Sequence, residues 1–183
     1  MSVGQARARR SDLPSRLARV EETGVREFLA FVLASETYAL PLSCVREIMR
    51  VPTVTAVPRA PVEVLGIISV RGQVTTLMDL RQKLQVEPAP IGSRTRILLV
   101  DQGDEILGLL CDRVLQVHRL SETEVEMASV LGSDASSYVM GIGRPGQRKL
   151  EAAREAKRRP AAGDEEILIL LDPIALLKRQ AYG

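Results

Sequence analysis

The sequence predicts a mainly β fold built from small sheets or barrels. Short runs of alternating apolar and polar residues are separated by turns rich in glycine, aspartate and serine. These runs follow one another at regular spacing, which argues against strand–helix–strand alternation. With 45% hydrophobic but only 3% aromatic residues, the core must be aliphatic. At 183 residues the chain has room for one ordinary domain or two small ones.

The first predicted elements follow a polar tail. Residues 1–24 lack periodicity and hold scattered arginines, which predicts a mobile basic tail. Apolar residues then alternate from 28 to 42 around a turn at 35–36, so we expect a hairpin with one buried face. Residues 42–50 place apolar side chains at helical spacing and predict a short helix. The proline-spaced segment 54–61 predicts an extended connection.

The most informative segment is 66–80, where two apolar, β-branched runs flank Arg71 and Gly72. This pattern predicts a β-hairpin in which glycine supplies the unusual backbone angles and the arginine is displayed on the turn. A guanidinium is planar, permanently charged and carries five donors, so it suits binding a carboxylate better than acid–base chemistry. The hairpin should end in a helical turn, 79–84, with Asp79 as its N-cap.

The second half of the chain predicts more short strands. A polar surface loop with a helical turn separates them from a final strand pair, and Asp172 followed by Pro173 predicts the start of a C-terminal helix. In chain order we expect strands at 96–100, 106–111 and 114–118, the loop at 121–137, and the strand pair 138–143 and 167–171.

The net charge of +2 conceals an uneven distribution. Residues 1–26 carry 6 Arg against 3 acidic residues, and residues 144–163 carry 7 Lys and Arg against 2. The rest has 12 basic and 18 acidic residues, so basic appendages flank an acidic body. Cys44 and Cys111 lie in apolar stretches, which indicates buried thiols in a reducing compartment. Since no stretch resembles a signal peptide or membrane helix, we expect a cytoplasmic protein.

Catalysis and cofactor binding find little support in the residue types. The single histidine, His118, is expected at a solvated strand end, and a pair with Cys111 would lack an orienting third group. Two cysteines and one histidine cannot supply a structural zinc site. The segment Gly141–Gly146 matches the dinucleotide fingerprint by letter but lacks its helix and its acidic residue. We therefore expect no enzyme activity, cofactor, metal ion or small-molecule substrate.

The basic stretch from 148 to 159 allows two interpretations. It fits a solvated insertion in a hairpin, or a patch for an anionic partner such as nucleic acid. The second interpretation is weakened because no aromatic residue is present to stack on a base. The patch would consist of Arg148, Lys149, Arg154, Lys157, Arg158 and Arg159.

Several segments together resemble the CheW family of chemotaxis coupling proteins. The similarity runs from about residue 26 to 180, and its most specific part is the block from Gly66 to Arg81. The other segments that carry it are Phe28–Phe31, Glu36–Leu42, Val45–Ile48, Val57–Pro58, Gly108–Val114 and Leu168–Asp172.

The resemblance implies two small SH3-like β-barrel subdomains within residues 25–180, with a boundary near 85–95, a hydrophobic groove between them and a C-terminal helix. It implies a non-catalytic adaptor that couples the cytoplasmic tip of methyl-accepting chemoreceptors to the regulatory domain of a CheA-type histidine kinase. That kinase domain has the same fold as CheW. Other CheW-like proteins in array rings are further expected partners, and the expected location is the cytoplasm, at membrane-bound or soluble receptor arrays.

The resemblance also assigns roles to individual residues. Arg71 matches the family's hairpin arginine, and Glu47 matches the acid that faces it. Leu42 and Val45 match positions that line the receptor groove, although both residues fit plain core packing equally well. Gly66 matches a position where a side chain would crowd the backbone.

Three features depart from the family pattern. Ser69 stands where the family usually has Asn, residues 144–164 form a charged insertion in the last hairpin, and the tail 1–24 is longer than the family needs. These departures leave two alternatives open. One is an accessory CheW-like protein that does not engage the kinase, and the other is a protein that binds an anionic partner through its insertion.

Overall fold

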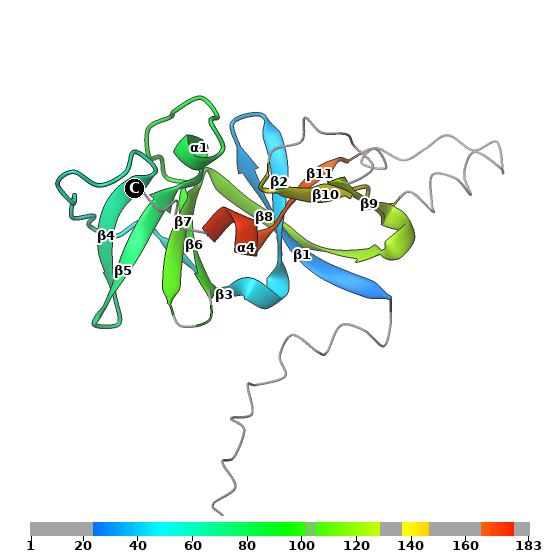
Figure 1. Ribbon diagram of the computed structural model, residues 1–183, viewed down its shortest axis with the longest axis horizontal. Helices are drawn as coiled ribbons and strands as arrows, with labels where there is room; N and C mark the ends of the chain where they lie inside the picture. The colour runs from blue at the N-terminus through cyan, green and yellow to red at the C-terminus, as the bar shows by residue number, and fades with distance from the viewer. Residues whose placement is uncertain (1–23, 102, 104, 129–136, 147–165, 178–183) are drawn as a thin grey trace, which may run out of the picture.

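The computed structural model of this chain describes residues 24–101, 103, 105–128, 137–146 and 166–177, and these form two β-sheets (Figure 1). The first sheet has the strand order β8-β1-β2-β11-β10-β9 among the described residues. Its strands are β1 (Val25–Leu33), β2 (Glu36–Pro41), β8 (Arg113–Ser121), β9 (Val125–Met127), β10 (Val139–Gly143) and β11 (Leu168–Leu171).

The second sheet has the order β3-β6-β7-β5-β4. In the described part of each sheet, one pair of neighbouring strands is parallel and the others are antiparallel. The parallel pair is β2 with β11 in the first sheet and β5 with β7 in the second. Short helices α1 (Leu80–Lys83) and α4 (Pro173–Leu177) complete the described part, so the predicted mainly β class is confirmed. The strands of the second sheet are β3 (Val45–Arg50), β4 (Val64–Val70), β5 (Gln73–Asp79), β6 (Arg96–Asp101) and β7 (Ile106–Cys111).

The two sheets are interleaved along the chain. After β2 the chain crosses to the second sheet through the 3₁₀ helix η2 (Leu42–Cys44), and it returns to the first sheet at Asp112, between β7 and β8. Residues 85–95 join β5 to β6, which both belong to the second sheet. The subdomain boundary expected at 85–95 is therefore wrong, because the sheets are assembled from non-consecutive parts of the chain.

The second sheet closes on itself through the segment that follows β3. The Thr55 amide donates to the Ile67 carbonyl oxygen at 2.9 Å, and the Ile67 amide donates to the Thr55 oxygen at 2.8 Å. Thr55 lies beyond the edge strand β3, whereas Ile67 belongs to the other edge strand, β4. The proline-spaced segment expected to be extended thus joins both edges, and the sheet becomes a small barrel.

One mainly aliphatic core is shared by the two sheets. It includes Phe31 and Leu40 of the first sheet with Leu98 and Leu109 of the second, and α4 adds two buried leucines, Leu176 and Leu177. In Figure 1, α4 lies across the junction of the sheets. Each sheet also has its own smaller buried cluster. The strands between these clusters are therefore buried on both faces, as the burial patterns of β1 and β6 show.

The helix expected at 42–50 is wrong beyond its first residues. Only Leu42–Cys44 form a 3₁₀ turn, and β3 then runs from Val45 to Arg50 with half-buried and exposed residues alternating. This segment pairs antiparallel with β6, and this pairing uses the backbone groups that face β6. The apolar spacing of this segment is compatible with a helix or a strand, and pairing with a strand distant in the sequence decides for the strand.

The other predicted elements are largely confirmed. The first hairpin turns at residues 34–35, one position earlier than expected, and the final strand pair forms as β10 and β11. Asp79 and Asp172 cap their helices by accepting hydrogen bonds from the amides of Arg81 at 2.9 Å and Ile174 at 2.8 Å. The loop expected at 121–137 contains the 3₁₀ helix η3 (Glu122–Glu124), but it also contains strand β9, which the prediction missed.

Within the described part of the chain, no helix is both long enough and apolar enough to cross a lipid bilayer.

Leu109→Ala tests whether the core is shared. Leu109 is fully buried between the sheets, so we expect a loss of about 2–5 kcal/mol in the free energy of unfolding, measured by urea denaturation. Amide hydrogen exchange should show that both sheets lose protection together. The control Val62→Ala, at a side chain 76% exposed, should change stability by about 0.5 kcal/mol or less. Lost protection confined to the second sheet would contradict a shared core.

Candidate functional site

Arg71 is displayed at the tip of the hairpin formed by β4 and β5. Val70 pairs with Gln73, so Arg71 and Gly72 form a two-residue turn, with φ of 50° and 84°. Positive φ at both central residues is what a type I′ turn requires. The sequence predicted this backbone angle for the glycine, and the structure shows that the arginine adopts it too. The Arg71 side chain is 80% exposed.

Glu47 faces Arg71 from the other edge of the barrel. Its Oε2 lies 2.9 Å from Nη2 of Arg71, so the structure brings together the pair that was expected to meet. Glu47 lies on β3 and is 36% exposed. An exposed ion pair of this kind contributes only about 0–1 kcal/mol to stability. Its main physical effect is to hold the guanidinium in one orientation at the surface.

Gly66 allows the barrel to close beneath this pair. A Cβ atom at this position would lie 2.3 Å from the Thr55 carbonyl oxygen and 2.9 Å from Cγ1 of Val54. The same Thr55 oxygen accepts the hydrogen bond from Ile67, so it cannot move away without opening the closure. The crowding expected at Gly66 is confirmed, and its cause is the chain that closes the barrel.

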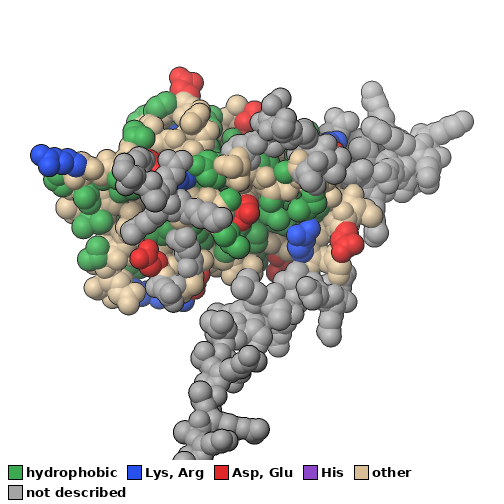
Figure 2. All heavy atoms as spheres, viewed as in Figure 1, with side chains coloured by type: hydrophobic (Ala, Val, Ile, Leu, Met, Phe, Trp, Pro, Cys, Tyr) green, Lys and Arg blue, Asp and Glu red, His purple; other side chains and the backbone are tan. Residues whose placement is uncertain are grey.

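Leu42 and Val45 lie where the chain crosses from the first sheet to the second. Both are half-buried and pack against the shared core, in line with the interpretation that they are core residues. Val45 lies two positions before Glu47 on β3, so the two residues are close along the chain. Figure 2 shows further hydrophobic side chains in the middle of the face that carries α4, where Ile174 is 70% exposed.

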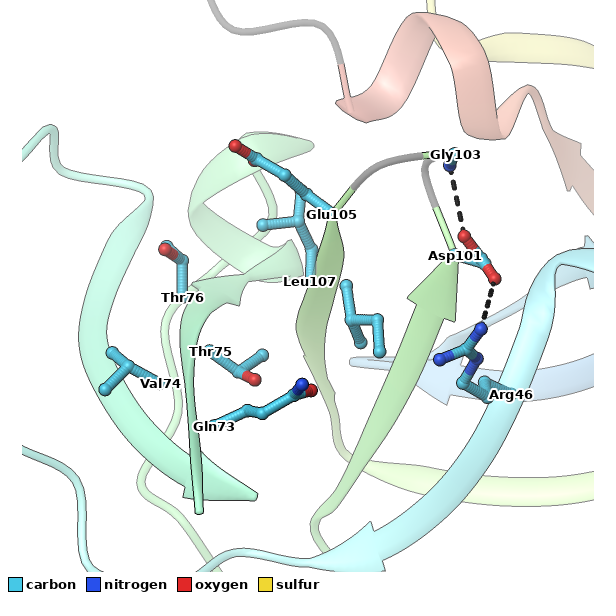
Figure 3. Close-up of a pocket in the computed structure, with 10 residues that line it drawn as sticks. Arg46, Gln73, Val74, Thr75, Thr76, Asp101, Gly103, Glu105 and Leu107 are labelled. Carbon is cyan, nitrogen blue, oxygen red and sulfur yellow. Dashed lines mark hydrogen bonds and ion pairs between the residues drawn. The ribbon is translucent and has the colours of Figure 1, made fainter. Parts of the chain in front are cut away.

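A polar groove of about 610 Å³ lies next to the Arg71 turn, and the sequence did not predict it. Figure 3 shows Arg46 on one side of the groove and Gln73 and Thr75 on the other. Nη2 of Arg46 donates to Oδ2 of Asp101 at 3.0 Å. The pairing of β3 with β6 shifts register at Arg46. No local pattern in the sequence links Arg46 to the β5 residues across the groove, which explains why the prediction missed it.

The two residues considered as a catalytic pair, Cys111 and His118, are both buried. Burial raises the pKa of the Cys111 thiol to about 12, so it stays protonated at neutral pH. His118 is only 8% exposed, and the solvated position expected for it is therefore wrong. Its strand pairs with β1, and its Nε2 lies 3.7 Å from Oε2 of Glu166. Among the described residues, no cluster of His, Cys, Asp and Glu side chains is suited to a metal ion.

The glycines of Gly141–Gly146 serve packing rather than phosphate binding. A Cβ atom at Gly141 would lie 2.4 Å from the Glu126 carbonyl oxygen, so this glycine permits close approach of β9. The Gly146 amide donates to Oε1 of Glu124 at 3.0 Å. A carboxylate therefore occupies the amide that a phosphate-binding loop would need to keep free.

The basic patch proposed between residues 148 and 159 lies outside the described residues, as does the tail 1–23. Ser69 is exposed on β4 and pairs with Val74, so its hydroxyl lies at the surface near the Arg71 turn.

Comparison with known proteins gives consistent results. The family model described as the CheW-like domain matches residues 27–181. The chemotaxis protein CheW of Helicobacter pylori is 32% identical over 130 residues, which cover 71% of this chain and 79% of that protein. Protein FrzA of Myxococcus xanthus is 27% identical over 129 residues, which cover 70% of this chain and 81% of that protein.

The fold has a close structural relative. The crystal structure of the scaffolding protein TtCheW from Thermoanaerobacter tengcongensis matches with a TM-score of 0.68, covering 86% of this chain and 95% of that one. Its sequence identity is 22%, so this likeness shows the fold alone.

Gly66→Ala tests the closure of the barrel. The added methyl group would meet the Thr55 oxygen, so we expect a loss of about 2–4 kcal/mol in the free energy of unfolding, measured by urea denaturation. The matched control is Gly72→Ala. Gly72 also has a positive φ but nothing within 4 Å of an added Cβ, so only the backbone cost of about 1 kcal/mol applies. Equal losses in the two variants would show that crowding at Gly66 is unimportant.

Proposed function

Because this chain belongs to the CheW-like domain family, we propose that it is a non-catalytic adaptor that couples chemoreceptors to a CheA-type histidine kinase. The observation that best supports this proposal is the exposed Arg71–Glu47 pair on a closed barrel. A charged group in a fixed orientation suits recognition of a partner protein. In this proposal the protein works in the cytoplasm, at receptor arrays.

The chemistry of recognition begins with Arg71. One of its terminal nitrogens contacts Glu47, which leaves other guanidinium donors directed to solvent. A carboxylate on the partner would accept hydrogen bonds from these donors, while Glu47 holds the guanidinium in place. Arginine is among the residue types that most often dominate the energy of protein interfaces.

Apolar contacts would supply the rest of the surface. Leu42, in η2, and Val45, the first residue of β3, are half-buried, so they present apolar area without being free to move. An apolar helix tip, such as that of a receptor, docks through a few anchors of this kind. Gly66 acts indirectly, because it allows the closure that fixes the hairpin. We include other CheW-like proteins in array rings among the proposed partners.

The direct test is reconstitution with receptor cytoplasmic fragments and a CheA-type kinase. We expect the wild-type chain to bind both partners in pull-down assays and to change kinase autophosphorylation in the presence of receptor. A wild-type chain that binds neither partner and leaves kinase activity unchanged would refute the adaptor proposal.

Arg71→Ala should weaken partner binding by about tenfold, which corresponds to about 1.4 kcal/mol, when measured by titration calorimetry. Unfolding free energy should change by less than about 1 kcal/mol, because the Arg71 ion pair is exposed. The matched control is Arg119→Ala on the first sheet, where an arginine 77% exposed pairs with Glu27 at 2.8 Å. If both variants lose affinity equally, Arg71 has no specific role.

A further inference from the structure

Asp112 is anchored in the first sheet at the point where the chain returns from the second. It is the residue between β7 and β8, and its amide donates to the Val32 carbonyl oxygen at 3.1 Å. Its Oδ2 accepts a hydrogen bond from the amide of Ala34 at 2.8 Å. Val32 lies on β1 and Ala34 in the turn that follows it, so both the backbone and the side chain of Asp112 are hydrogen-bonded to the first sheet.

Arg81 reaches the same carboxylate from the second sheet. It lies in α1, directly after β5, and its side chain is only 11% exposed. Its Nε donates to Oδ1 of Asp112 at 2.7 Å, and its Nη2 donates to Oδ2. Its Nη1 donates to the Glu87 carbonyl oxygen. Two parallel hydrogen bonds to one carboxylate fix the direction of approach as well as the distance.

The turn at Ala34 depends on this carboxylate. Ala34 has φ of 54°, a left-handed conformation that is unfavourable for a residue with a Cβ atom. Such a conformation persists only where its surroundings hold it in place. The hydrogen bond from Ala34 to Asp112 does so, and thereby connects the shape of the first hairpin to Arg81.

Lys83 makes a second contact between α1 and the first sheet. Its Nζ lies 5.3 Å from the ring centroid of Tyr138, the residue before β10, and 3.8 Å from Oε1 of Glu63. The Lys83 side chain is 4% exposed, so these contacts are made largely out of water. The helix α1 therefore touches the first sheet through two cationic side chains.

The hydrogen bonds between Arg81 and Asp112 can fix an angle between the two sheets, which apolar contacts cannot. The shared core is apolar, and apolar contacts hold surfaces together without specifying an angle between them. Hydrogen bonds weaken steeply when their angles change. We infer that Arg81 and Asp112 are positioning residues that fix the orientation of one sheet against the other. This inference requires no partner protein and so does not depend on the proposed function.

Distance measurement between spin labels tests the inference. Labels at Met127→Cys, in β9 of the first sheet, and Val74→Cys, in β5 of the second, occupy exposed positions. The native Cys44 and Cys111 should stay unlabelled at pH 7, because burial raises both thiol pKa values to about 12. Labelling of the native chain checks this selectivity.

Two conservative variants are measured in the labelled chain. Arg81→Lys keeps the charge but cannot form the two-bond contact, and Asp112→Asn keeps the shape but loses the charge. We expect the distance distribution to become about twofold wider in each variant, since the sheets gain freedom to rotate. The control Arg119→Met, which removes an ion pair within the first sheet, should leave the distribution unchanged.

Either of two results would overturn the inference. Folded variants that keep the narrow wild-type distribution would show that the apolar core alone sets the orientation. Variants that all fail to fold would show that the contact is required for stability rather than orientation.

A second experiment compares the affinity for each partner with receptor control of the kinase. This experiment rests on the proposed function. In the reconstituted system, Arg81→Lys should bind receptor fragment and kinase separately with affinities within about twofold of wild type, because the surface of Arg71 is unchanged. Receptor control of the kinase should be lost. If the adaptor proposal is wrong, wild type itself will not bind, and the spin-label result will be unaffected.

Discussion

The two sheets share one mainly aliphatic core, and most other features of the structure depend on that arrangement. On β1, Phe28 packs inside the first sheet while its neighbour Leu29 packs in the shared core. On β6, Ile97 and Leu98 divide in the same way between the second sheet and the shared core. Strands buried on both faces must be flanked by protein on both sides, so neither sheet is complete without the other. The chain meets this requirement by crossing between the sheets twice, at 42–44 and at Asp112.

The candidate site follows from the first of these crossings. After it, β3 carries Glu47 along one edge of the second sheet, and the extended segment beyond β3 returns to the opposite edge at Ile67. Closure places the β4–β5 hairpin beside Glu47, so the Arg71–Glu47 pair spans the joined edges. A surface held on a closed barrel needs little ordering when a partner arrives, which favours affinity. The ion pair adds little to the stability of the fold, and its main effect is to fix the position of the Arg71 guanidinium.

Sequence reasoning succeeded where local chemistry decides and failed where distant pairing decides. The Arg71 turn and the caps at Asp79 and Asp172 depend on neighbouring residues, so they were predictable. The helix expected at 42–50 failed, because pairing with β6 lies far along the chain. The burial of His118 and the boundary at 85–95 were missed for the same reason. The Arg71–Glu47 contact came from family resemblance, since no local pattern links the two residues.

The central claim is that the surface around Arg71 and Glu47 binds a receptor or kinase partner, and amide chemical shifts measure this directly. Isotope-labelled protein would be titrated separately with the kinase regulatory domain and with a receptor tip fragment. The account predicts that the amides of Arg71, Gly72 and Glu47 shift strongly with at least one partner, while those of β9 do not. Saturable binding of both partners that leaves all three amides unchanged would contradict it.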